Sequence, residues 1–132
     1  MPEYSNPATL PSPYGLYSHM AHSAGSLHFV AGQLPINEDG SLIGADDFAA
    51  QLKEVFERIE AAARSVGLGL ENAVQFTTYL AGRELVPEFY KARQALFDRI
   101  YPNGGYPPNT LVVVAGLVEP GVLVEVQTIL GG

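Results

Sequence analysis

Apolar residues recur every three or four positions between residues 48 and 66, and this period is typical of a helix with one buried face. Asp46 or Asp47 can cap that helix, because a carboxylate accepts hydrogen bonds from the free backbone N–H groups of the first turn. Gly67 marks its end, and Gln51 falls on the opposite, polar face. The predicted apolar face consists of Phe48, Leu52, Val55, Phe56, Ile59 and Val66.

A second helix is predicted from about Pro87 to about Ile100, since proline suits the first turn of a helix. Its apolar face consists of Phe89, Ala92 or Arg93, Leu96, Phe97 and Ile100. On the first helix, Glu57 and Glu60 are better explained as part of a solvated face than as a catalytic pair.

Short apolar segments bounded by glycine and proline predict the strands. Segments 16–24 and 27–31 are joined through the small residues Ala24-Gly25-Ser26, which predicts a hairpin. Residues 73–80 are rich in β-forming types. The β-branched run 112–114 predicts a strand buried on both faces. Together with the run 122–130, which follows a Glu-Pro-Gly turn, it predicts a second hairpin at the centre of the sheet.

The predicted order is two strands, a helix, a strand, a helix and two strands. This order predicts an α/β (α+β) fold, with a single mixed β-sheet and both helices packed on one face. The chain length fits one domain, residues 1–132, in which residues 1–15 hold four prolines and form an irregular lead-in. The other face of the sheet needs a cover, and in a chain this small the expected partner is another subunit.

Composition excludes several classes of function. The net charge is −7, and the seven Lys and Arg residues form no basic run. A nucleic-acid partner is therefore disfavoured, because phosphate contacts need clustered cations. The absence of cysteine excludes disulfides, thiolate catalysis and cysteine-based zinc sites. We expect no signal peptide and no membrane partner, since no apolar run approaches the roughly 18 residues that cross a bilayer. The expected location is the cytoplasm.

Polar residues within the predicted strands are the candidates for chemistry. Asn109 follows two prolines, where it either caps the turn or contacts a ligand. Gln127 lies inside the last strand, where a buried amide needs hydrogen-bond partners. Glu125 points to the same face as Gln127, and is a candidate base or an interface ion pair. His19 is a second candidate acid or base, with a structural role as the alternative. The other histidines show no metal-ligand pattern, and neither a metal nor a cofactor is expected.

Five motifs follow one another at characteristic spacing. They are Tyr17-Ser-His, Phe29-Val-Ala-Gly-Gln-Leu-Pro35, the helix 51–66 with the strand sequence after it, Tyr106-Pro-Pro-Asn-Thr, and Val124-Glu-Val-Gln. In order and spacing they resemble the RidA/YjgF family of reactive-intermediate deaminases, whose older label is "endoribonuclease L-PSP". The motifs together span nearly the whole chain, although none is diagnostic alone.

This resemblance implies a chorismate-mutase-like fold, assembled as a homotrimer with clefts between subunits. Deaminases of the family hold a substrate carboxylate with an arginine, and they position the hydrolytic water with a glutamate. In this sequence those two positions are Asn109 and Gln127. The family's signature serine is Ala31, and its helix asparagine is Tyr90. The resemblance implies that the cleft is lined by Tyr17, Ala31, Gly32, Tyr90, Asn109 and Gln127.

Loss of the arginine and the glutamate together predicts a neutral, hydrogen-bonding cleft. Gln127 cannot act as a base near neutral pH, so classical 2-imino acid deaminase activity is not expected. The leading hypothesis is a homotrimer that binds a neutral or weakly acidic small molecule. A second is an enamine, imine or amide hydrolase with His19 or Glu125 as its base. A third is a non-catalytic assembly or chaperone-like protein. A ribonuclease is disfavoured, because the acidic chain has no basic groove.

Overall fold

The structure is a computed structural model that describes the whole chain, residues 1–132. Two short 3₁₀-helices, at residues 70–72 and 83–85, accompany the main elements. The main elements in chain order are β1 (Glu3–Ser5), β2 (Met20–His22), β3 (Leu27–Gln33), α1 (Phe48–Arg64), β4 (Ala73–Leu80), α2 (Val86–Ile100), β5 (Asn109–Val113) and β6 (Val124–Gly131).

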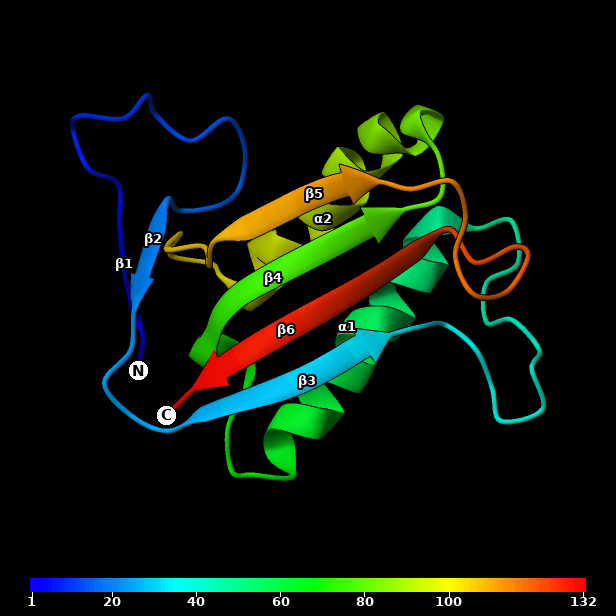
Figure 1. Cartoon of the computed structure of the whole chain (residues 1–132), viewed down its shortest axis with the longest axis horizontal. Coiled ribbons are helices and arrows are strands. Elements are labelled where there is room, and N and C mark those ends of the chain that lie inside the picture. The colour runs from blue at the N-terminus through cyan, green and yellow to red at the C-terminus, as the bar shows by residue number, and fades with distance from the viewer.

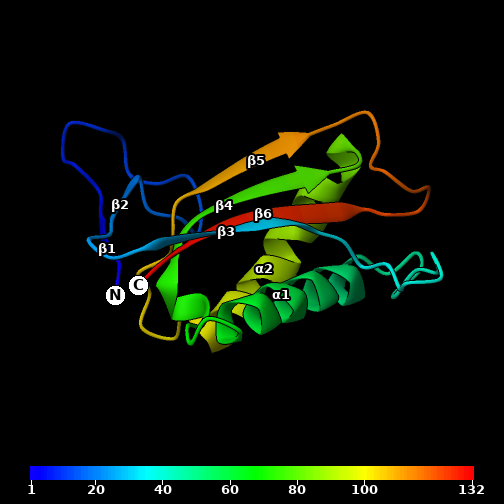
Figure 2. The ribbon, with the colours of Figure 1, turned by 60° about the horizontal axis from the view of Figure 1, so that its bottom comes forward.

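The main sheet has four strands in the order β3-β6-β4-β5, in which only the β4–β5 pair is parallel. Both helices lie against one face of this sheet, and the opposite face carries no helix (Figure 2). The predicted mixed sheet with two helices on one face is therefore confirmed. The short strands β1 and β2 form a separate antiparallel ribbon at one end of the sheet (Figure 1).

The core lies between the sheet and the helices because the residues of the two central strands alternate. From Phe76 to the end of β4, and along β6 as far as Leu130, every second residue is buried and the residues between them are at least partly exposed. The ring of Phe56 on α1 packs edge-on against Phe76 of β4 and Phe97 of α2, with centroids 5.3 and 5.8 Å apart. These rings join both helices to the sheet.

Neither predicted hairpin forms. The segment 27–31 belongs to β3, which pairs with β6, whereas β2 pairs with β1 in the lead-in that was expected to be irregular. β5 does not pair with β6, because β4 lies between them. A parallel pair needs a crossover connection, and α2 supplies the crossover from β4 to β5. β5 is consequently an edge strand with half-exposed residues, not a strand buried on both faces.

Helix α1 begins and ends close to its predicted limits. Its cap is Asp47, whose Oδ1 accepts a hydrogen bond from the Ala50 backbone N–H at 3.1 Å. The helix ends at Arg64, so Val66 lies beyond it and is 47% exposed. The prediction that Val66 completes the apolar face is therefore wrong, because the helix ends two residues earlier.

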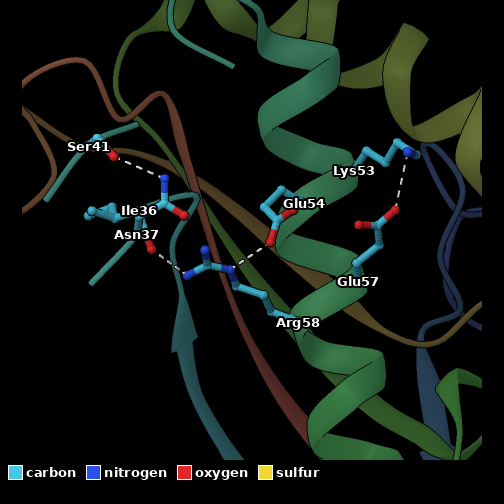
Figure 3. A network of polar contacts seen from close by, with 7 residues as sticks. All are labelled: Ile36, Asn37, Ser41, Lys53, Glu54, Glu57 and Arg58. Atoms are coloured by element: carbon cyan, nitrogen blue, oxygen red, sulfur yellow. Dashed lines mark hydrogen bonds and ion pairs between the residues drawn. The ribbon is translucent and has the colours of Figure 1, made fainter. Parts of the chain in front are cut away.

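The outer face of α1 carries ion pairs between residues one turn apart (Figure 3). Lys53 Nζ lies 3.2 Å from Glu57, and Arg64 pairs with Glu60 at 2.6 Å. The interpretation of both glutamates as a solvated face is thus supported, and such exposed pairs add little stability. Arg58 reaches further, since it binds Glu54 at 2.8 Å and also donates to the Ile36 carbonyl at 2.7 Å. It ties α1 to the segment that follows β3.

Gln51 does not lie on a solvated face, as its place in the sequence suggested, but is fully buried. Its Nε2 donates to the carbonyls of Gly44 and Gly121, at 3.1 and 3.0 Å. Its Oε1 accepts from the Leu123 N–H at 2.8 Å. One side chain thereby connects α1, the loop before it and the chain entering β6.

We expect Gln51→Ala to lower the free energy of unfolding by about 2–3 kcal/mol, because it leaves the Leu123 N–H without its acceptor. Urea denaturation of the purified chain measures this change. The matched control is Gln94→Ala on α2, where the exposed amide binds only Asp98, and we expect a change within about 0.5 kcal/mol there. Equal effects of the two substitutions would contradict the connecting role of Gln51.

Candidate functional site

A cleft of about 320 Å³ opens where three segments meet: the N-terminal loop between β1 and β2, helix α2, and the start of β5. The N-terminal segment lies beside the start of β5 at one end of the sheet (Figure 1). The residues that line the cleft are Tyr14, Gly15, Tyr17, Tyr90, Arg93, Asn109, Thr110 and Leu111. Three of the predicted site residues, Tyr17, Tyr90 and Asn109, are therefore brought together within one chain.

Asn109 reaches the cleft because of the register of β5. It pairs with Phe76 of β4, whose buried ring lies on the helix side of the sheet. The Asn109 side chain accepts a hydrogen bond from Thr78 Oγ1, with the oxygens 2.8 Å apart. Thr78 holds the amide in this orientation, and the Asn109 Nδ2 group makes no hydrogen bond within the chain. Two amide hydrogens thus remain able to donate to a ligand.

Tyrosines form the aromatic wall of the cleft. The Tyr17 hydroxyl accepts from the Tyr14 backbone N–H at 3.1 Å, so its own proton remains free to donate. Tyr90 projects from α2 and is 38% exposed. These rings offer flat apolar surfaces together with hydroxyl groups, a combination typical of small-molecule sites.

Arg93 supplies a buried cation to the same cleft, although it was considered in the sequence only as a position on the apolar face of α2. The residue is only 4% exposed. Its Cζ lies 4.6, 5.5 and 5.9 Å from the ring centroids of Phe89, Tyr90 and Phe97. Burial lowers the pKa of the Arg93 guanidinium, which still stays protonated near neutral pH because an unperturbed arginine titrates far above that range. The expectation of a neutral cleft is therefore wrong for this cavity.

The other predicted ligand contacts lie on the opposite, open face of the sheet. Gln127 pairs with Thr77 of β4, the residue after Phe76, which pairs with Asn109. Because successive strand residues point to opposite faces, Gln127 and Asn109 lie on opposite faces of the sheet. Its Oε1 accepts from the Tyr79 hydroxyl at 3.3 Å. Ala31 is exposed on β3. A side chain at Gly32 would overlap the Glu125 carboxylate, so glycine is needed there for packing. Within one chain, these residues do not join Asn109.

His19 lies outside the cleft, in the loop that leads into β2. Its Nε2 is 2.7 Å from the Pro11 carbonyl, which can only accept, so this nitrogen carries the proton. The ring also packs edge-on against Tyr17, with centroids 5.7 Å apart. These contacts hold the N-terminal loop and favour the structural role for His19.

The model of the family described as endoribonuclease L-PSP matches residues 8–130. The chain belongs to this family, the RidA/YjgF family. It is 31% identical to a RutC family protein of Pyrococcus abyssi, a match over 90% of this chain and 88% of the relative. A RutC family protein of Pyrococcus horikoshii is 29% identical, over 90% of this chain and 89% of that protein.

A solved structure supports the same fold. The crystal structure of a Rid family protein of unknown function from Yersinia pestis superposes with a TM-score of 0.83 at 25% identity. The match covers 99% of this chain and 98% of the other. The RidA/YjgF fold is therefore established for this chain, and the chemistry of the cleft must be argued from its own residues.

The sequence motifs identified Tyr17, Tyr90 and Asn109 but not Arg93, Tyr14, Thr110 or Leu111. The signal for Arg93 was its spacing, because Phe89 and Phe97 lie one turn before and one turn after it on the buried side of α2. No group of histidine and acidic side chains is arranged to hold a metal ion. Neither helix is long and apolar enough to cross a bilayer.

Glu125 lies on the open face of β6, where burial raises the pKa of its carboxyl group. The folded chain therefore binds this proton more tightly than the unfolded chain does. As the pH rises from the ordinary glutamate range, about 4.3, through the folded pKa, the charged Glu125 reduces stability.

We expect Glu125→Gln to raise the melting temperature at pH 7, and this difference should shrink as the pH falls to about 4, where both side chains are neutral. Thermal unfolding followed by circular dichroism at several pH values measures it. Glu119→Gln, in an exposed loop, is the control and should change little. A lower melting temperature for Glu125→Gln at pH 7 would instead indicate that a cation pairs with Glu125.

Proposed function

We propose that this RidA/YjgF chain forms a homotrimer that binds a small organic molecule in the cleft between the N-terminal loop, α2 and β5. The observation that supports this function is the convergence of Tyr17, Tyr90 and Asn109 on one cavity. Its volume of about 320 Å³ falls at the small end of the range for ligand sites. The chain's acidity and its scattered cations argue against nucleic acid as the ligand.

Self-association is supported by the open face of the sheet. The β3 residues Leu27 and Phe29 are 50% and 74% exposed on this face. Large apolar side chains on a strand face are typical of surfaces that another chain covers. Residues on the open face, including Gln127 and Glu125, would then lie at the contact between subunits.

Classical 2-imino acid deaminase chemistry is not part of the proposal. An amide at position 127 neither removes a proton from water nor carries the charge that orients it. Asn109 provides hydrogen bonds but no charge at the position that corresponds to the family's arginine. We therefore propose binding without this hydrolysis.

A hydrolase that uses Glu125 is the second candidate function. A raised pKa brings a carboxyl group closer to the working range of a general base. Glu125 lies outside the cleft of its own chain, so this candidate requires a neighbouring subunit to close a site over the open face. The contacts of His19 make it the weaker base of the two considered.

We expect native mass spectrometry at micromolar concentration to give about three times the chain mass of 14.1 kDa. Phe29→Asp should shift the protein to monomer, because it places a charge on the apolar open face. Val118→Asp is the matched control, since Val118 is 71% exposed but lies in the loop between β5 and β6. A monomeric wild-type chain would contradict the proposed assembly.

We expect the natural chain not to hydrolyse 2-aminoacrylate, whereas an arginine-bearing family member assayed alongside it does. The double variant Asn109→Arg/Gln127→Glu should gain activity in the assembled protein, because it restores the cation and the carboxylate that this chemistry uses. Ammonia release measures both rates. Equal activity of the natural chain and the relative would contradict the proposal, and loss of that activity in Glu125→Gln would favour the second candidate.

A further inference from the structure

Arg93 differs from every other cation of the chain. Three of the seven Lys and Arg residues pair with glutamates on α1, and three others are exposed. The paired residues are Lys53, Arg58 and Arg64, and the exposed ones are Arg83, Lys91 and Arg99. Arg93 is the remaining one, and it is buried without an anionic partner.

The hydrogen-bonding groups of Arg93 are left unused by its own chain. Its Nε is buried and has no hydrogen-bond partner. The guanidinium lies over the rings of Phe89, Tyr90 and Phe97, which attract the cation but do not replace hydrogen-bond acceptors for its five N–H groups. A buried charge whose donors are unsatisfied is costly, and such groups in native proteins normally have a partner. Acceptors for these donors come from outside the chain, from solvent, a ligand or another subunit.

The cleft gives such a partner room beside Arg93. Gly15 of the N-terminal loop lies beside the guanidinium, since a β-carbon at residue 15 would lie only 3.0 Å from Arg93 Nη2. The absence of a side chain there keeps the end of the guanidinium uncrowded. The Asn109 amide adds further donors, and no aspartate or glutamate lines the cleft. The site is therefore built from donors and one positive charge.

We infer that Arg93 anchors a small organic carboxylate in this cleft, with the Asn109 amide as a second donor and the tyrosine rings against the body of the ligand. The planar fork of a guanidinium matches the two oxygens of a carboxylate. The aromatic wall and Leu111 favour a short, flat, unsaturated body over a highly hydrated inorganic anion. This inference rests on the proposed ligand-binding function and specifies the chemical class of the ligand.

Crotonate and crotonamide are a suitable pair of probes, because they have nearly the same shape and differ in charge. Titration of the full-length ¹⁵N-labelled protein, followed by NMR, gives both affinities. We expect crotonate to bind at least about ten times more tightly than crotonamide, because hydrogen bonds between the guanidinium and a charged carboxylate are stronger than those to a neutral amide. The Arg93 Nε–H resonance should shift with crotonate and not with crotonamide.

Variants of Arg93 distinguish the contribution of its charge to ligand binding from the contribution of its apolar stem. Arg93→Met keeps an apolar stem and should remove the preference for crotonate, whereas Arg93→Lys keeps the charge and should retain part of it. Arg99→Met, on the same helix but outside the cleft, is the matched control and should bind both probes like the natural chain. The comparison of the two probes on the natural protein needs no variant, so it decides the question even where a variant fails to fold.

Four results would overturn the inference. Equal binding of the two probes, unchanged in Arg93→Met, would leave the ligand-binding cleft in place but without a carboxylate anchor. Absence of binding by both probes would remove the proposed ligand-binding function as well. Inorganic phosphate that competes equally well through Arg93 would indicate a general anion site. Dissociation of the assembled protein in Arg93→Met would indicate that the missing partner is a carboxylate of a neighbouring subunit.

Discussion

The parallel pairing of β5 with β4 is the constraint on which the cleft depends. It places Asn109 opposite Phe76, on the side of the sheet that faces the helices. The same pairing makes β5 an edge strand, so that the start of the strand remains open to the N-terminal loop. Because parallel strands require a crossover, α2 necessarily passes behind this edge and brings Tyr90 and Arg93 to it. An antiparallel hairpin between β5 and β6 would have built a different site.

Alternation along β6 divides the polar chemistry of the chain between two faces. Val124, Val126 and Thr128 point toward the helices, and Glu125 and Gln127 point to the open face. The helix side of the sheet edge therefore holds a cation and amide donors, while the open face holds a carboxyl group and an amide acceptor. One chain alone cannot bring these two sets to the same ligand. Chemistry that uses both sets requires a second copy against the open face.

The helices and the central strands were predictable from the sequence, because each has a clear period and a buried face that decides its orientation. The pairing of β5 was not predictable from the sequence, because its apolar run fits an edge strand beside β4 as well as a hairpin with β6. Gln51 was misjudged for a related reason, whereas Arg93 was correctly named as a candidate for the apolar face of α2 but was not recognised as a cation of the cleft. Periodicity indicates which face a polar residue occupies, but it does not reveal whether a distant segment will bury it. The backbone of Gly121 and Leu123 covers Gln51, and Gly15 of the N-terminal loop lies beside the Arg93 guanidinium.

The relation between Asn109 and Arg93 explains how a cleft can lose a charged residue from a strand without losing its charge. Family resemblance places a carboxylate-binding arginine at residue 109, where this chain has an amide held by Thr78. The guanidinium of Arg93 enters the same cleft from α2 instead, fixed by the aromatic rings of Phe89 and Phe97. A cation held by packing on a helix approaches the ligand from a different wall than one on the strand edge. A molecule held by Arg93 would therefore be oriented differently from one held by an arginine at residue 109. A different part of that molecule would then face the N-terminal loop. If Arg93 anchors a carboxylate as we infer, this change of cation position would alter which chemistry the same fold supports.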